Sequence, residues 1–414
     1  MDLAAVDALR EDLDAFCAEV FASIPRRDTR AWGNCYLRGL MLDGRRKSIQ
    51  PMAERLPDGD MQSLQQFVGQ SPWDPAPVQR RIATKVSRAI RPTAWIVDDT
   101  TVPKAGRQSV GAAHQWCGAL GKQAVCQDFV SLHAVTDQAS VPLSWRLFLP
   151  ESWADGADER RTKARVPQEA GHREKWRLAL DEIDEALSWG LEAPAVVGGD
   201  SAYGTNHAFR EGLAERGLDY VVGVRADVIA HPGQAVPEAP QRAGRRGRPP
   251  QPRYRSPARS LKQLVMEQGR SVLRRCTWRQ GSRGPLRGRF LVLAVRPAGV
   301  AARTTARERG GGAAGWDGVL PAETLIAEWP PHEPEPTDYW LSSLPADTPL
   351  RHLVAMAKIR WRIEHDYREL KHGLGLDHYE GRTWRGWHHH LTLVTAAQAF
   401  LTLRRLDPKA PTSA

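Results

Sequence analysis

The order of apolar segments between residues 94 and 224 constrains the fold of this chain more than any other feature. Strand-like patterns occur at 94–97, 129–135, 141–149, 195–199 and 220–224. Helical periodicity separates the last three of them, over about 172–189 and again up to about 216. Strands joined first by short turns and then by helices predict an α/β domain built on a mixed sheet.

The segments on either side of this core have a different pattern. Residues 1–90 are expected to be helical, because apolar residues such as Leu9, Leu13 and Phe16 recur at three- and four-residue steps. Strand patterns return at 272–278 and 290–295, after a Pro-, Arg- and Gly-rich stretch at 235–258. We therefore divide the chain into a helical module (1–90), the first part of the core (91–228), a β-rich insertion (229–345) and the C-terminal helices of the core (346–414).

The composition points to a polyanionic partner. Lys and Arg number 58 against 48 Asp and Glu, which gives a net charge of +10. Nucleic acid is the first candidate; the alternative is a basic protein from a GC-rich genome. Because small helical modules with basic faces commonly bind DNA, we interpret residues 1–90, which carry the run Arg45, Arg46 and Lys47, as a DNA-binding domain.

Cysteine usage and hydropathy exclude several classes. None of the five cysteines forms a Cys-x-x-Cys pair, which argues against a zinc ribbon and a disulfide framework. No secretory leader is evident at the N-terminus, and no apolar run approaches the length that spans a membrane. A protein of the reducing cytoplasm with no membrane partner is expected.

Three carboxylates stand out by their positions. Asp99 ends the first predicted strand, Asp200 follows the fourth, and Glu364 lies on a late helix. If the first and fourth strands are neighbours, both aspartates reach one edge of the sheet, and a helix packed there adds Glu364. Such an all-oxygen site suits Mg²⁺ or Mn²⁺. Taken singly, an aspartate after a strand is more often a turn or cap residue.

The neighbour of Asp99 leaves the first ligand open. Asp98 and Asp99 point to opposite faces if the strand continues through both. We favour Asp99 as the ligand and interpret Asp98 as its structural partner.

The late helix is predicted to run from 358 to 371. At 3.6 residues per turn, Arg360, Glu364 and Lys371 share one stripe, so a carboxylate lies between two cations. This pattern suits a metal ligand beside a phosphate backbone. The alternative is a solvent-exposed helix face with ordinary ion pairs, which gives the same sequence pattern.

Together these features resemble the RNase H-like fold of DDE transposases. The likeness is closest to the bacterial insertion-sequence branch that carries the signature Tyr-x2-Arg-x3-Glu-x6-Lys. Arg360, Glu364 and Lys371 match its spacing, whereas Ala357 stands at the tyrosine position. The other matching segments, which together span most of the chain, are Asp98-Asp99-Thr100-Thr101, Gly199-Asp200-Ser201, 38–48 and 375–382.

The resemblance implies cut-and-paste DNA transposition. It implies Asp99, Asp200 and Glu364 as the catalytic ligands of Mg²⁺, with Mn²⁺ as a substitute, and a homodimer on double-stranded DNA, at terminal inverted repeats and at the target. We interpret Arg360 and Lys371 as phosphate ligands near the scissile bond. The further candidate DNA contacts are Arg45, Arg46, Lys47, Lys104, Arg246 and Arg248.

Two alternatives to an active transposase stay open. One is a DNA-binding protein without catalysis, such as a domesticated or decayed element product. The other is an RNase H-like nuclease that cuts DNA but does not join it. The segment Arg246-Gly247-Arg248-Pro249 matches the core of a minor-groove arginine hook, a short match in an arginine-rich stretch.

Overall fold

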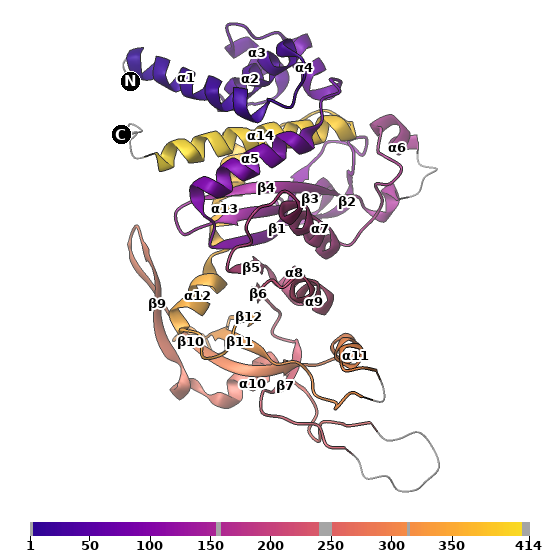
Figure 1. Cartoon of the computed structure of the whole chain (residues 1–414), viewed down its shortest axis with the longest axis vertical. Helices are drawn as coiled ribbons and strands as arrows, with labels where there is room; N and C mark the ends of the chain where they lie inside the picture. The colour runs from indigo at the N-terminus through magenta and orange to yellow at the C-terminus, as the bar shows by residue number, and fades with distance from the viewer. Residues whose placement is uncertain (1–2, 155–158, 240–250, 313–314, 408–414) are drawn as a thin grey trace. The chain divides into compact units, whose positions relative to one another are not determined.

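The computed structural model describes residues 3–154, 159–239, 251–312 and 315–407 (Figure 1). It divides into two compact units, one made of residues 1–194 and 361–414 and the other of residues 195–360. Each unit is described here by itself. Among the described residues, none of the helices combines the length and the apolar character that crossing a membrane requires.

The first unit begins with five helices, as the periodicity of residues 1–90 predicts. They are α1 (Leu3–Val20), α2 (Arg27–Met41), α3 (Ile49–Arg55), α4 (Met61–Gly69) and α5 (Pro75–Ile90). Side chains cap two of them: Asp60 accepts a hydrogen bond from the backbone of Ser63, and Asp74 accepts one from the backbone of Ala76. Pro75 occupies the first position of α5, where its missing N–H costs nothing.

An antiparallel sheet follows in the same unit. Its strands are β1 (Ala94–Pro103), β2 (Ala113–Cys117), β3 (Lys122–Val135) and β4 (Ser140–Phe148). The long strand β3 pairs with the other three, and Asp98 lies opposite Ser131 while Asp99 lies opposite Val130. The short strand β2 has no counterpart among the sequence predictions, because five residues give too little alternation to detect.

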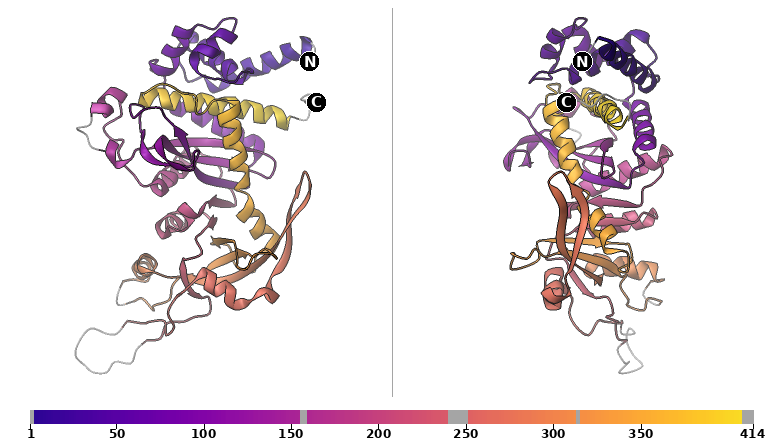
Figure 2. Two further views of the ribbon diagram at one scale, coloured as in Figure 1. Left: turned by 180° about the vertical axis from the view of Figure 1, so that it is seen from behind. Right: turned by 90° about the vertical axis from the view of Figure 1, so that its left-hand side faces the viewer.

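Helices cover this sheet on both faces. The helix α7 (Lys175–Ser188) packs on β3 and β4, and α13 (Trp361–Arg368) packs on β1 and β4. The long helix α14 (Trp384–Leu406) is buried along most of its length between α2, α4, α5 and β4, as both figures show (Figures 1 and 2). The short helix α6 (Glu159–Ala164) lies in the connection between β4 and α7.

The second unit contains a parallel strand pair continued by an antiparallel sheet. The strands β5 (Val196–Gly199) and β6 (Tyr220–Gly223) are parallel and are joined through α8 (Ser201–Gly204) and α9 (His207–Glu215). From β6 the order continues as β12 (Asp338–Ser342), β11 (Glu323–Glu328), β10 (Gly284–Pro297), β7 (Ile229–Pro232) and β8 (Arg259–Ser260). The strand β9 (Arg274–Gly281) pairs with β10 alone.

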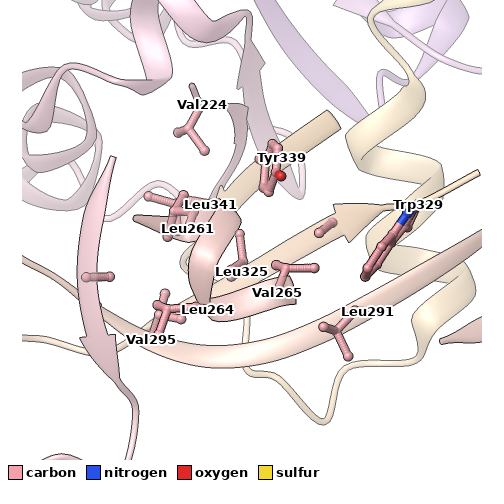
Figure 3. Close-up of a cluster of buried hydrophobic side chains, with 12 residues drawn as sticks. Val224, Leu261, Leu264, Val265, Leu291, Val295, Leu325, Trp329, Tyr339 and Leu341 are labelled. Atoms are coloured by element: carbon pink, nitrogen blue, oxygen red, sulfur yellow. The ribbon is translucent and has the colours of Figure 1, made fainter. Parts of the chain in front are cut away.

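Three helices complete the second unit, namely α10 (Leu261–Gln268), α11 (Val300–Arg309) and α12 (Leu350–Lys358). Its core lies where α10 packs against the antiparallel strands (Figure 3). The members shown there are Val224, Leu261, Leu264, Val265, Leu291, Val295, Leu325, Trp329, Tyr339 and Leu341. The predicted fold class, an RNase H-like α/β core with a β-rich insertion and an N-terminal helical module, is confirmed; the four-part division of the chain stays a prediction.

The prediction of one continuous helix over 358–371 is wrong. The helix α12 ends at Lys358, Ile359 and Arg360 form a turn, and α13 starts at Trp361 and ends at Arg368. The chain breaks there because α12 packs on the strands of the second unit and α13 on those of the first. A π-helical turn over Glu369–Gly373 follows, which widens the spacing and moves Lys371 off the stripe that a regular α-helix would give it.

Candidate active site

The strand β1 presents its two aspartates to different faces of the first unit's sheet. Asp98 is buried and shares the face of its cross-strand partner Ser131, whose hydroxyl lies 2.7 Å from the hydroxyl of Tyr367 on α13. Burial raises the pKa of Tyr367 well above its usual range, and the charge of Asp98 raises it further. Asp98 therefore belongs to the packed layer between the sheet and α13.

Asp99 lies on the opposite face, beside a carboxylate and a cation that sequence reasoning missed. Asp128 on β3 is the cross-strand partner of Thr101 and so shares this face with Asp99. The ammonium group of Lys175, the first residue of α7, lies 2.7 Å from Oδ2 of Asp99 and 2.5 Å from Oδ2 of Asp128. One cation is thus held between two carboxylates.

Burial sets the protonation of this cluster. It raises the pKa of Asp128 to about 6, an effect that Lys175 opposes and Asp99 reinforces. Burial alone would lower the pKa of Lys175, but the two carboxylates outweigh it, so the net pKa of Lys175 is raised. The lysine is therefore charged at neutral pH. Oδ1 of Asp128 is buried and has no hydrogen-bond partner among the described residues.

A cavity of about 510 Å³ opens at this cluster. It is lined by Asp99, Asp128 and Lys175, by Tyr367 of α13 and by Lys371 of the π-helical turn. The remaining lining residues are Thr100, Thr101, Gln115, Trp116, Gly118, Ala119 and Phe148. Asp98 is not among the lining residues. A cavity of this size accommodates a nucleotide-sized group.

Lys371 is held at the cavity wall by two contacts. Its Nζ donates a hydrogen bond of 3.1 Å to the backbone carbonyl of Thr101 and lies 5.9 Å from the centre of the Tyr367 ring. Burial lowers its pKa, while Asp377, Cys117 and Asp128 raise it in part. An ammonium group with unsatisfied donors at this place can bind a phosphate.

The helix α13 is anchored by the residues that follow Glu364. Asp366 is buried, with Oδ2 3.1 Å from Nδ1 of His133 and Oδ1 accepting a hydrogen bond of 2.6 Å from Ser140. Ile363 is also buried, whereas Glu364 is exposed. The buried neighbours fix α13 on the sheet and leave the Glu364 carboxylate on its solvent-facing side.

Asp200 belongs to the second unit, directly after β5. Its Oδ1 accepts a hydrogen bond of 2.8 Å from the backbone of Ala202, so the residue caps α8. The backbone packs tightly behind it: a Cβ on Gly204 would lie 2.0 Å from the carbonyl oxygen of Gly223, which only glycine permits. Asp200 is held firmly, with one carboxylate oxygen used by the cap.

The meeting of Asp99, Asp200 and Glu364 stays a prediction, because Asp200 is in a different unit from the other two. Within the parts of the chain that the structure describes, no three His, Cys, Asp or Glu side chains are grouped closely enough to hold a metal ion. The structure groups Asp99 with Asp128 and Lys175, a set that no local motif could reveal, since these residues come together only through strand pairing and the packing of α7.

The predicted DNA contacts have different surroundings. Arg45 and Arg46 are exposed, but Lys47 is buried and its ammonium group donates to the carbonyl of Leu42. Lys104 donates a hydrogen bond of 2.8 Å to the carbonyl of Tyr379, and burial lowers its pKa to about 8. These two lysines already serve contacts within the first unit.

The remaining predicted contacts lie elsewhere. Arg360 is in the turn after α12, at the end of the second unit. Arg246 and Arg248 lie outside the described residues.

Comparison with known proteins places most of the chain in one family model. The model described as DDE superfamily endonuclease matches residues 19–285, well over half of the 414 residues. A curated relative, the probable transposase for insertion sequence element IS701 of Microchaete diplosiphon, is 26% identical over 192 residues. This match covers 46% of the chain and 47% of the relative, so the chain spans about half the length of the relative.

A solved structure also aligns with the chain. It is the cryo-EM structure of the piggyBac transposase synaptic complex with hairpin DNA, with a TM-score of 0.38 and 11% sequence identity. The alignment covers 98% of this chain and 80% of that one.

Proposed function

Because the chain belongs to the DDE superfamily endonuclease family, we propose that it is a DNA transposase that cuts its element from double-stranded DNA and joins it elsewhere. The observation that carries the proposal is the cavity of the first unit, where the carboxylate of Asp99 and the ammonium groups of Lys175 and Lys371 face one space. The similarity to a probable insertion-sequence transposase supports it.

The proposed reaction is a pair of phosphoryl transfers at the ends of the element. In the first, a water molecule loses a proton as its oxygen displaces the 3′ oxygen of a phosphodiester, and the leaving oxygen takes up a proton. In the second, the freed 3′ hydroxyl loses its proton as it displaces the 3′ oxygen of a target phosphodiester, and that displaced oxygen takes up a proton. Both transition states gather negative charge on the phosphoryl oxygens, which cations stabilise.

The side chains of the candidate site have the chemistry that a divalent metal ion requires of its ligands. Asp99 offers a hard oxygen ligand, and the position beside it already stabilises a positive charge, the ammonium of Lys175. We propose that Asp99, Asp200 and Glu364 would hold Mg²⁺. When bound, the ion supplies Lewis-acid activation of the nucleophile and neutralises charge at the leaving oxygen.

The remaining groups of the cavity act on the substrate and on Asp99. Lys371 is placed to donate to a non-bridging phosphate oxygen, because its ammonium group reaches the cavity from the wall that carries Thr101. Lys175 holds the carboxylate of Asp99 in a fixed direction, and its contact with Asp128 fixes the position of the lysine side chain. Tyr367, with its hydroxyl bound to Ser131, closes the wall behind them.

A strand-cleavage and strand-joining assay tests the proposal. The purified chain is incubated with Mg²⁺ or Mn²⁺ and a labelled duplex that carries the inverted repeats flanking its gene, together with a supercoiled target plasmid. We expect cut ends and joined products, formed by two copies of the chain on paired ends. Cutting without joining would support a nuclease instead, and binding without cutting would support a DNA-binding protein that lacks catalysis.

A further inference from the structure

The strands β9 and β10 form a two-stranded ribbon that extends beyond the sheet of the second unit. The strand β10 pairs with β11 only from Phe290 to Val295, whereas residues 284–289 of β10 pair with β9 alone. Figures 1 and 2 show this ribbon as a long projecting hairpin. Because this part of β10 has β9 as its only strand partner, the role of the ribbon depends on the side chains on its two faces.

One face of the ribbon carries apolar side chains next to the exposed Arg274, and it packs on the unit's own helix α12. Cys276, Trp278 and Phe290 alternate onto this face, with the rings of Trp278 and Phe290 in an edge-to-face contact at 5.6 Å. The ammonium group of Lys358 on α12 lies 6.0 Å from the Trp278 ring and forms an ion pair with Glu328. The charge of Glu328, whose strand pairs with β10, is therefore offset by Lys358.

The other face carries a cluster of arginines. Arg275 lies directly opposite Arg289 in the pairing of the strands, and Arg287 lies opposite Thr277, one step along the same face. Directly paired side chains in an antiparallel ribbon have their Cβ atoms about 5 Å apart, and like charges there are destabilising. Arg275 and Arg287 are exposed and Arg289 is half-buried. We call these three residues the arginine face.

No acidic side chain offsets this cluster. The sequence from Gln268 to Arg307 contains ten arginines and no Asp or Glu. In the described part of the chain, none of Arg275, Arg287 and Arg289 forms an ion pair with a carboxylate. A folded ribbon that holds like charges together without a countercharge gains stability when an external polyanion supplies one.

We propose that the arginine face binds the phosphate backbone of double-stranded DNA. A two-stranded ribbon fits the major groove, and guanidinium groups grip phosphates through paired hydrogen bonds. Phosphate contacts set position and affinity but carry no sequence information, so the ribbon holds the duplex while other residues choose the site. The inference rests on the proposed function, because it takes DNA as the substrate. It adds a DNA-binding surface that is distant in sequence from the candidate catalytic residues.

The test measures DNA affinity without catalysis. The full chain and the triple variant Arg275→Gln, Arg287→Gln, Arg289→Gln are titrated onto an end-bearing duplex without divalent metal, from 50 to 200 mM salt. We expect the variant to bind roughly tenfold or more weakly at the low-salt end, and its salt slope to fall by about 0.9 for each lost phosphate contact. The loss is expected to be equal on unrelated sequences.

A matched control removes the same charge from the same unit. The variant Arg225→Gln, Arg255→Gln, Arg259→Gln loses three arginines that are paired with Asp227, Glu238 and Glu267. It is expected to bind like wild type. The single variant Arg287→Gln, at an exposed position, replaces the triple variant if that one unfolds, and its slope should fall by about one.

Equal affinity and salt slope in the ribbon variant and the control would overturn the inference. So would a ribbon variant that changes the mass of the assembly in light scattering but not its affinity for DNA, because the face would then bind protein. Ribbon-dependent binding by a chain that never cuts DNA would leave the inference intact and reject the proposed function. If wild type cuts DNA and the ribbon variant binds DNA as tightly as wild type does, the proposed function stands and the inference about the ribbon is rejected.

Discussion

Lys175 donates from Nζ to Oδ2 of Asp99 at 2.7 Å, although the two residues are 76 positions apart in the sequence. The same ammonium group contacts Asp128 on the neighbouring strand. The direction of a carboxylate that lines the cavity of the first unit is therefore set by the first residue of a helix.

Replacing Lys175 by methionine should lower end cleavage strongly and leave DNA binding nearly unchanged. The substitution removes the cation between Asp99 and Asp128, so the pKa of Asp128, which Lys175 now lowers, should rise further and Asp99 should lose its fixed direction. Lys175→Arg should restore part of the rate because the charge returns. The control Lys122→Met removes an exposed lysine from the same sheet. Unchanged cleavage by Lys175→Met would show that Asp99 needs no such partner.

Separate substitutions of Asp98 and Asp99 should have different effects. Asp99 lines the cavity, so Asp99→Asn should reduce cleavage by on the order of a thousandfold while the melting temperature stays close to wild type. Asp98 is buried beside α13, so Asp98→Asn should mainly lower the melting temperature. Cleavage rates and thermal unfolding are measured on the same preparations. If Asp98→Asn alone abolished cleavage, the assignment of Asp99 would be wrong.

Lys371 should contribute to the rate more than to affinity. Its ammonium group reaches the cavity from the π-helical turn, and removing one donor to a developing phosphoryl charge costs on the order of a hundredfold in rate. We expect Lys371→Ala to show this loss with a small change in the dissociation constant, and Lys371→Arg to recover some activity. Lys163→Ala, which removes an exposed lysine paired with Glu159, serves as the control. If the role of Lys371 were only structural, Lys371→Ala would lower the stability of the protein and leave the cleavage rate per folded molecule unchanged.

The stability of the first unit should fall as the pH drops below about 6.5. Burial lowers the pKa of His388 and of His389 to about 4 and that of His390 to about 3. The unfolded chain binds these protons near pH 6.5 and the folded chain only near pH 4 or below, so protons favour unfolding across that window. Asp128, with its pKa raised to about 6, and Glu182, whose pKa burial raises well above its usual range, act in the opposite direction, but they are two groups against three.

Thermal melting from pH 8 to pH 4 measures this dependence. The melting temperature should be nearly level above pH 7 and should decline progressively below pH 6.5. His389→Gln should flatten part of the decline, because it removes one of the three imidazoles whose pKa is lowered by burial. A melting temperature that rises from pH 7 to pH 4.5 would contradict the assignment of these histidines as neutral buried groups.

Sequence periodicity was sufficient to predict those helices and strands that bury one face and expose the other. The helices of residues 1–90 and the strands around Phe129 and Val197 follow from such patterns, and the RNase H-like fold class is confirmed. The break at Ile359 and Arg360 could not be predicted, because the local sequence is compatible with helix and only the packing of α12 and α13 on different strands interrupts it. Tertiary packing overrode local propensity there.

The candidate site was predictable only in part. Carboxylates that follow strands can be found by position, as Asp200 after β5 shows. Asp99 lies inside β1, which continues to Pro103, and it does line a cavity. Asp128 and Lys175 could not be found, because their approach depends on the register of β1 with β3 and on where α7 begins. Lys47 and Lys104 appear as basic residues in the sequence, yet their ammonium groups are used by backbone carbonyls.

Single-turnover cleavage of an end-bearing duplex tests whether Asp99, Asp200 and Glu364 together perform metal-dependent phosphoryl transfer on DNA. Wild type is compared with Asp99→Asn, Asp200→Asn and Glu364→Gln in Mg²⁺, with DNA affinity measured in parallel. We expect cleavage by wild type, a loss of at least about a thousandfold in each variant, and unchanged affinity in all of them. Cleavage at the wild-type rate by any one of the three variants would show that its carboxylate has no part in the reaction.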